Sequence, residues 1–196
     1  MASLEEIKKL RELTGVGVAD ALQILQEANG DLERASDLVR KKGLAAAEKK
    51  SSRAARSGLV HAYVHGGKVG VLVEVNCETD FVAKTADFKD FVHDVALQAA
   101  AMQPRYISRG DVPDAVERAE REILREQISG SGKTGEIQDR VIEGKLEKFF
   151  EEVCLLEQYS VKDPKIKMGQ LLANLVSKVG ENIVIARFVR YQLGEK

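Results

Sequence analysis

The hydrophobic pattern of the first 43 residues predicts three short helices. Leucine and isoleucine recur at helical spacing after Ser3 and Glu6, a pair typical of the capping box that begins a helix. The segment Thr14-Gly15-Val16-Gly17 interrupts this pattern, and a second apolar stripe ends at Asn29-Gly30. We expect the third helix to end at Gly43. A module this small has a marginal core, so binding to a partner protein is expected to stabilise it.

Residues 44–57 differ in composition, with four basic residues among alanines and serines. This composition predicts a basic, partly helical linker. Positive charge of this density also suits RNA or an acidic partner, but a solvated linker is the interpretation that we favour.

From Leu59 onward the hydrophobic period changes from helical to alternating, which predicts a strand as far as His65. Gly66-Gly67 supplies the backbone angles of a tight turn. Valine at every second position over Val69–Val75 then predicts a returning strand with one buried face. This strand leads through Thr79-Asp80-Phe81 into an amphipathic helix.

The remaining pattern is mainly helical and ends in a strand. Apolar stripes predict helices over about 113–128 and 136–152, which would form a helical hairpin. A further helix near 167–179 and a strand over 182–193 follow. Strands interspersed with helices in this order indicate an α+β domain.

The predicted fold class is therefore α+β, with a UBA-like module of three helices, a helical linker, and a core that combines a small antiparallel sheet with a helical hairpin. The predicted domains are the three-helix module over 1–43, the basic linker helix over 44–57 and the α+β core over 58–196. A small sheet leaves strand edges exposed, and exposed edges favour pairing or burial. The core is therefore predicted to be a dimerisation domain, forming a homodimer or a large partner interface.

Composition narrows the range of partners and compartments. Lys and Arg total 30 and Asp and Glu total 31, so the chain lacks the cationic surplus that direct binding to nucleic acid requires. No stretch approaches the roughly 20 apolar residues of a membrane span, and the charged start of the chain does not resemble a signal peptide. The two cysteines form no CxxC pair. These features predict a cytoplasmic protein that does not bind membranes.

Candidate chemistry is sparse. Ser129-Gly130-Ser131-Gly132-Lys133-Thr134 is similar to the end of a phosphate-binding loop, but Gln127 stands where that motif begins with glycine, and a charged helix precedes it. Cys77 paired with one of the three histidines would make a thiolate and base, but a buried cysteine in a valine-rich strand is the favoured interpretation. No spacing is typical of metal ligands. We therefore expect no catalytic residues, no metal, no cofactor and no enzymatic activity.

Three motifs in the same order resemble the elongation factor Ts family, in its short bacterial-type form. The first, near the N-terminus, is Leu10-Arg11-Glu12-Leu13-Thr14-Gly15-Val16-Gly17 followed by Asp20. The second, across the predicted strand-to-helix turn, is Glu74-Val75-Asn76-Cys77-Glu78-Thr79-Asp80-Phe81-Val82-Ala83. The third, before the last strand, is Gly180-Glu181-Asn182-Ile183 followed by Arg187-Phe188. The resemblance thus spans nearly the whole chain.

This resemblance implies a guanine-nucleotide exchange factor that binds elongation factor Tu carrying GDP and disturbs the magnesium and phosphate site. The contacts that it implies lie at the strand-to-helix turn and near the paired glycines of the first motif, at Thr79, Asp80, Phe81, Val82, Leu13, Val16 and Val18. The short form also implies a homodimer. The chain departs from the family pattern at Val18, Ala19, Leu22, Gln23, Tyr159 and Ser160.

Each of these residues also has a purely structural interpretation. Without the resemblance, Phe81 suits a core position at a strand-to-helix junction, and Asp80 suits a helix cap. The loop that contains Gly15 and Gly17 is equally suited to docking and to internal packing. The alternative function is a three-helix adaptor on a dimerising core with no exchange activity.

Overall fold

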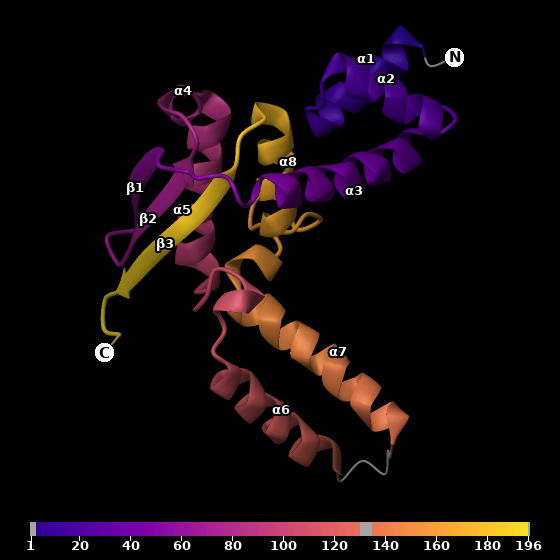
Figure 1. Cartoon of the computed structure of the whole chain (residues 1–196). Helices are drawn as coiled ribbons and strands as arrows, with labels where there is room; N and C mark the ends of the chain where they lie inside the picture. The colour runs from indigo at the N-terminus through magenta and orange to yellow at the C-terminus, as the bar shows by residue number, and fades with distance from the viewer. Residues whose placement is uncertain (1–2, 130–134, 196) are drawn as a thin grey trace. The chain divides into compact units, whose positions relative to one another are not determined.

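A computed structural model describes residues 3–129 and 135–195, and the chain divides into two compact units. One unit comprises Met1–Ala96 with Gln170–Lys196, and the other comprises Leu97–Gly169. Helices and one small sheet alternate along the chain (Figure 1), which confirms the predicted α+β class. In chain order the elements are α1 Leu4–Thr14, α2 Val18–Glu27, α3 Leu32–Lys50, β1 Ser57–His65, β2 Val69–Cys77, α4 Asp80–Ala83, α5 Ala86–Met102, η1 Arg109–Asp111, α6 Asp114–Ser129, α7 Glu136–Val153, η2 Leu155–Glu157, α8 Met168–Val179 and β3 Ile183–Gln192.

The N-terminal helices α1, α2 and α3 begin and end largely as the sequence predicts. Ser3 and Glu6 form the predicted capping box, and Gly15 ends α1 in the left-handed conformation at φ 72°. The three helices pack through one buried cluster that includes Leu10 and Leu25. The likeness to UBA modules and the domain boundaries at residues 43 and 57 remain predictions.

The prediction that Gly43 ends the third helix is wrong, because α3 continues through Gly43 to Lys50. A glycine inside a helix costs only about 1 kcal/mol relative to alanine. Residues 44–50 are mostly alanine, glutamate and lysine, which are good helix formers. Their preference for the helix outweighs the cost of one glycine, so the helical part of the predicted linker belongs to α3.

The sheet has the strand order β1-β2-β3, and both strand pairs are antiparallel. The predicted turn at Gly66-Gly67 is present, with φ values of 56° and 68°. A β-bulge between Glu74 and Val75 shifts the register between β2 and β3. The sheet therefore follows the prediction, with β2 in the centre.

The two faces of the sheet differ in burial. One face carries the predicted valine row of β2, of which Val71, Val73 and Val75 are buried together with Cys77. On β1 the same face carries His61 and Tyr63. This face packs against α5, since His93 of α5 lies 3.3 Å from His61, Nδ1 to Nε2, and its ring contacts Tyr63. The opposite face remains largely exposed although most of its side chains are apolar. Its exposed large hydrophobic residues are Val60, Val64, Leu72, Val184, Val189 and Tyr191. We call this surface the open sheet face.

The second unit contains the predicted helical hairpin. Helices α6 and α7 enclose a buried cluster of Leu124, Ile128, Ile142, Leu146 and Phe150. Next to the hairpin, the buried side chain of Gln98 joins α5 to the segment that follows η2. It donates to the side chain of Gln158 at 3.2 Å and to the carbonyl of Tyr159 at 3.0 Å. The hairpin therefore has its own core.

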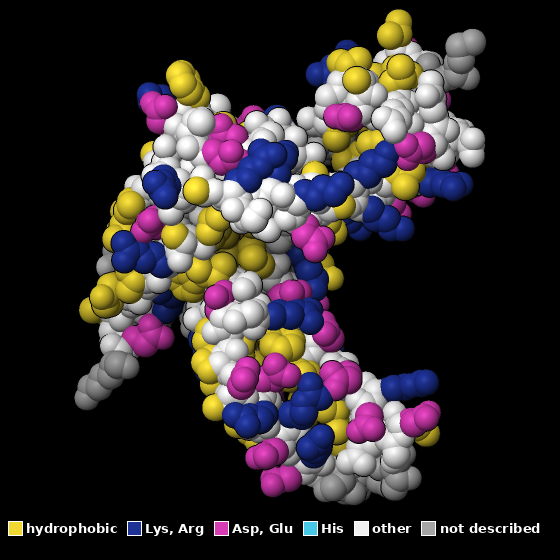
Figure 2. Space-filling model, in the orientation of Figure 1, with side chains coloured by type: hydrophobic (Ala, Val, Ile, Leu, Met, Phe, Trp, Pro, Cys, Tyr) yellow, Lys and Arg dark blue, Asp and Glu magenta, His cyan; other side chains and the backbone are white. Residues whose placement is uncertain are grey.

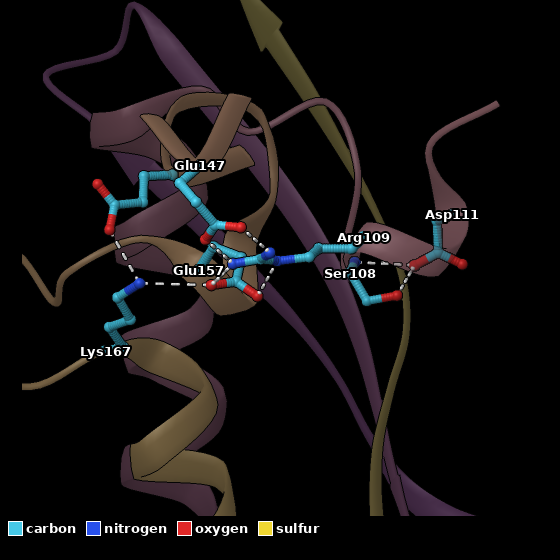
Figure 3. Close-up of polar contacts among 7 residues, drawn as sticks. Ser108, Arg109, Asp111, Glu147, Glu157 and Lys167 are labelled. Atoms are coloured by element: carbon cyan, nitrogen blue, oxygen red, sulfur yellow. Dashed lines mark hydrogen bonds and ion pairs between the residues drawn. The ribbon is translucent and has the colours of Figure 1, made fainter. Parts of the chain in front are cut away.

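A charge network braces the base of this hairpin (Figure 3). The guanidinium of Arg109 donates two hydrogen bonds of 2.6 Å to Glu147 and bonds of 2.7 and 3.0 Å to Glu157. Lys167 extends the network to Glu151 at 2.9 Å and to Glu157 at 3.4 Å. Arg109 also lies 4.9 Å from the ring centre of Phe150. One arginine thus links η1, α7 and η2.

Among residues 3–129 and 135–195, no helix combines the length and the apolar character that crossing a membrane requires.

Candidate functional site

The turn between β2 and α4 presents Phe81 to solvent. The side chain of Phe81 is 80% exposed, and hydrophobic atoms project from the surface at α4 (Figure 2). Val82 and Ala83, the next residues of α4, are buried. The interpretation of Phe81 as a core residue is therefore wrong. An exposed aromatic ring on a turn with a buried underside is an arrangement suited to insertion into a partner protein.

Asp80 lies beside Phe81 at the first position of α4. Its carboxylate accepts a hydrogen bond of 2.6 Å from Lys84, one helical turn later. This hydrogen bond, together with the positive charge of Lys84, lowers the pKa of Asp80. The N-cap position of α4 is occupied by Thr79, so the interpretation of Asp80 as the cap is wrong. Asp80 therefore offers an exposed, ionised carboxylate next to the exposed ring.

Thr79 is held by the turn that precedes β3. Its backbone N–H donates to one carboxylate oxygen of Glu181 at 3.0 Å, and its hydroxyl donates to the other at 2.6 Å. Both donors are thus satisfied within the chain. The sequence motif around Glu181 predicted no role for this residue. Its bond to Thr79 joins positions 102 residues apart, which a local pattern does not reveal.

Val82, for which the resemblance implies a partner contact, is buried, with only 9% of its surface exposed. The helical turn directs Val82 toward the interior when Phe81 points outward, since successive side chains on a helix diverge by about 100°. Val82 therefore anchors α4, and its contact with a partner stays a prediction.

The N-terminal candidates differ from one another in exposure. Leu13 is 67% exposed and Val18 is 55% exposed, whereas Val16 is half-buried and packs against the core of the helical module. The loop between α1 and α2 is held by a hydrogen bond of 3.3 Å from Arg11 Nε to the carbonyl of Val16. Leu13 and Val18 therefore suit docking, and Val16 contributes to packing. These residues and Phe81 belong to different elements.

The candidate chemistry at Cys77 finds no support. Cys77 is fully buried, and its thiol donates to the carbonyl of Thr79 at 3.1 Å. Burial raises the pKa of Cys77, and the nearby charge of Glu181 adds to this effect. Among residues 3–129 and 135–195, no group of three or more His, Cys, Asp or Glu side chains is arranged to hold a metal ion. In the segment similar to a phosphate-binding loop, the residues from Gly130 to Thr134 lie outside the part of the chain that the structure describes.

The open sheet face is a second surface suited to protein contacts. Figure 2 shows hydrophobic side chains over the strands. A shallow groove there is lined by Val60, Leu72 and Val189, and the ion pair between Glu74 and Arg187 at 2.7 Å borders it. The sequence predicted exposed strand edges rather than this face. The alternating apolar residues of β1 carried the signal, since valines lie on the side opposite His61 and Tyr63.

The exposed ring, the adjacent carboxylate and the open sheet face are features of a protein that acts by binding other proteins. Comparison with known proteins then identifies the family. Residues 46–195 match the family model described as Elongation factor TS. The chain therefore belongs to the elongation factor Ts family, and this match together with full-length relatives confirms the family resemblance.

Individual relatives match over nearly their whole length. The chain is 55% identical to Elongation factor Ts of Thermoanaerobacter sp. (strain X514) over 196 residues, covering all of this chain and 96% of that protein. It is 54% identical to Elongation factor Ts of Carboxydothermus hydrogenoformans over 196 residues, covering all of this chain and 90% of the relative. It is 50% identical to Elongation factor Ts of Thermotoga neapolitana over 195 residues, or 99% of this chain and 98% of the relative.

Proposed function

We propose that this chain is a guanine-nucleotide exchange factor of translation elongation, which binds elongation factor Tu carrying GDP and promotes release of the GDP. It acts in the cytoplasm and catalyses no chemical reaction. The observation that carries the proposal is the exposure of Phe81 beside the ionised carboxylate of Asp80, in a chain of the elongation factor Ts family.

Exchange requires distortion of the nucleotide site of the partner. A GTPase holds GDP through backbone amides, a helix N-terminus and a magnesium ion with strict octahedral geometry, so small displacements weaken binding. Insertion of the Phe81 ring between elements of the partner supplies a displacement. The carboxylate of Asp80, placed next to the ring, repels phosphate and competes for the surroundings of the magnesium ion.

Phe81 does not supply enough free energy alone. Burial of one phenylalanine side chain contributes about 1.5–3 kcal/mol, whereas reversing an equilibrium from 1:99 to 99:1 requires about 5.5 kcal/mol. Leu13 and Val18 expose further apolar surface that a partner would cover. Docking of the N-terminal module is therefore proposed to supply part of the difference, with Val16 shaping the loop. By thermodynamic reciprocity, GDP weakens binding of the factor as much as the factor weakens binding of GDP.

A homodimer is the second part of the proposal. Two copies that pack their open sheet faces together would cover apolar side chains that solvent otherwise contacts. A twofold interface of this kind uses the same patch on both chains. Each dimer would then carry two copies of the Phe81 turn.

The test follows GDP release directly. Elongation factor Tu loaded with a fluorescent GDP is mixed with the chain and excess unlabelled GDP, and release is followed by stopped-flow fluorescence. The wild-type chain is expected to accelerate release, and Phe81→Ala is expected to reduce this acceleration about 10- to 150-fold, because that factor corresponds to about 1.5–3 kcal/mol.

Ile137→Ala is the matched control, since Ile137 of α7 is also an exposed apolar residue but lies in the other unit. It is expected to behave as wild type. If the wild-type chain binds its partner but leaves GDP release unchanged, the adaptor function is correct and the exchange function is not.

A further inference from the structure

The motif Gly180-Glu181-Asn182 has no role in the function proposed above. We infer that Glu181 is a positioning residue for exchange, which fixes the turn from which Phe81 projects. This inference rests on the proposed function, because it concerns the same exposed ring. Glu181 would act through Thr79 and need not contact the partner itself.

The short helix that carries Phe81 is not stable by its own hydrogen bonds. Helix α4 has four residues, whereas isolated helices shorter than about 12 residues are marginal in water. Its N-cap, Thr79, makes no side-chain hydrogen bond to the helix. Instead, the backbone N–H and the hydroxyl of Thr79 both donate to the carboxylate of Glu181, at 3.0 and 2.6 Å. The start of α4 is thus held from outside the helix.

A reciprocal contact adjoins this one. The backbone N–H of Asn182 donates to the carboxylate of Glu78 at 2.7 Å, and the Asn182 side chain donates to the carbonyls of Arg53 at 2.7 Å and Ser51 at 3.3 Å. Asn182 is buried. Two consecutive residues before β3 therefore bind two consecutive residues after β2, and they also bind the segment that follows α3. We call these contacts the turn clamp.

Gly180 makes the clamp sterically possible. It follows the end of α8 with a φ of 79°, a left-handed conformation that glycine adopts without strain, and its N–H still donates to Val176 at 3.0 Å. The chain leaves the helix at this point, and the next two residues make the clamp. Each residue of the motif thus has a structural role: Gly180 redirects the chain after α8, and Glu181 and Asn182 form the clamp.

Fixing this turn favours insertion of the ring. A side chain on a mobile turn loses conformational freedom when it binds, and that loss lowers affinity. Phe81 is held from below by buried Val82 and Ala83, and its turn is held from the side by Glu181. Removal of the carboxylate leaves the underside intact but frees Thr79. The expected result is a folded chain with a poorly placed ring.

The experiment is a double-mutant cycle in the GDP-release assay. Glu181→Ala removes both hydrogen bonds that Thr79 donates in the clamp, and Thr79→Val removes only the one from the hydroxyl. Glu181→Ala is expected to lower the maximal release rate about tenfold and Thr79→Val to lower it less, in proportion to the loss of charge-assisted hydrogen bonds. Thr79→Ser retains the hydroxyl and is expected to lose less than Thr79→Val. In the Phe81→Ala background, Glu181→Ala is expected to add no further loss, because its effect passes through Phe81. An equal loss in both backgrounds would show that Glu181 acts on overall structure, and the inference would be wrong.

Amide hydrogen exchange gives a readout that does not depend on the partner. In Glu181→Ala the amide of Thr79 is expected to exchange about tenfold faster, whereas amides of β2 such as Val73 are expected to keep their wild-type rates. Unchanged exchange at Thr79 would contradict the clamp. Glu151→Gln, which removes an ion pair of 2.9 Å with Lys167 in the other unit, is the control for loss of a glutamate charge.

The two failures are distinguishable. If the wild-type chain does not accelerate GDP release, the proposed function is wrong, and so is the part of the inference that concerns exchange; the Thr79 amide still decides whether the clamp exists. If wild type is active and Glu181→Ala has the same maximal rate, the proposed function stands and the positioning role of Glu181 is wrong.

Discussion

Neighbouring residues of one short turn differ sharply in their exposure to solvent. Phe81 is exposed and Val82 is buried, and the two share a helix of four residues. The same strand-to-helix turn begins at Cys77, whose thiol is buried and donates to the carbonyl of Thr79. Exposure to solvent and anchoring to the core therefore differ between neighbouring residues of this turn.

Both cysteines are expected to be unreactive in the folded chain. Cys77 and Cys154 are fully buried, and burial raises the pKa of Cys77 and raises that of Cys154 to about 11. Since the thiolate is the reactive form, a thiol reagent is expected to modify the folded chain at least about a hundredfold more slowly than the chain unfolded in denaturant. The measurement is the absorbance of the aromatic thiolate that an aromatic disulfide reagent releases when it reacts with a cysteine.

An engineered exposed thiol, Ile137→Cys, is the control, because it should react at the rate of the unfolded chain. Rapid modification of Cys77 in the folded wild-type chain would contradict this prediction and would favour the alternative in which Cys77 is a nucleophile.

At the scale of secondary structure, the base of the helical hairpin should respond to acid. Arg109 donates hydrogen bonds to Glu147 and Glu157, and these bonds are the main reason that both carboxyl pKa values lie below their ordinary value of 4.5. A carboxyl group whose pKa is lower in the folded state contributes stability above its ordinary pKa, and this contribution is lost as the pH falls through the lowered value. The network is therefore expected to stabilise the hairpin above about pH 4.5 and to weaken below it.

Arg109→Gln tests this expectation. The variant is expected to be less stable than wild type by roughly 1–2 kcal/mol at neutral pH, a range reduced for partial exposure to solvent, and the difference should shrink as the pH falls to about 3. Thermal unfolding followed by circular dichroism at several pH values measures it. Lys8→Gln removes an exposed ion pair of 3.9 Å and is expected to change stability little at any pH. A constant difference between Arg109→Gln and wild type across this range would contradict the assignment.

The sequence predicted elements better than it predicted their ends and contacts. Alternating valines and the glycine pair predicted β1 and β2, because period and turn residues are local signals. Gly43 misled the prediction for α3, since its small local cost is outweighed by the helix formers that follow. The exposure of Phe81 was suggested only by family resemblance, because a local pattern does not show which neighbouring elements cover a turn. The bond between Thr79 and Glu181 joins distant positions and leaves no periodic trace.

For the whole molecule, the open sheet face poses the question of assembly. Its apolar side chains project from all three strands of the sheet, and contact with a second copy would remove them from water. We expect the chain to be a dimer, in which this face packs on the same face of a second copy. A charge introduced into this face should then act twice, once from each chain.

Val60→Lys tests the dimer without damaging the fold. Val60 lies opposite Glu74 in the neighbouring strand, so a lysine there gains a cross-strand partner of opposite charge in the monomer. In the dimer the ammonium groups would be buried against apolar side chains, and we expect dimerisation to weaken by about a hundredfold or more. Sedimentation equilibrium over a range of concentrations measures the change. Ile137→Lys, at a residue of nearly equal exposure (62% against 64%), is the control and should keep the wild-type mass. A monomeric wild-type chain, or a Val60→Lys variant that dimerises as wild type does, would rule out this face as the dimer interface.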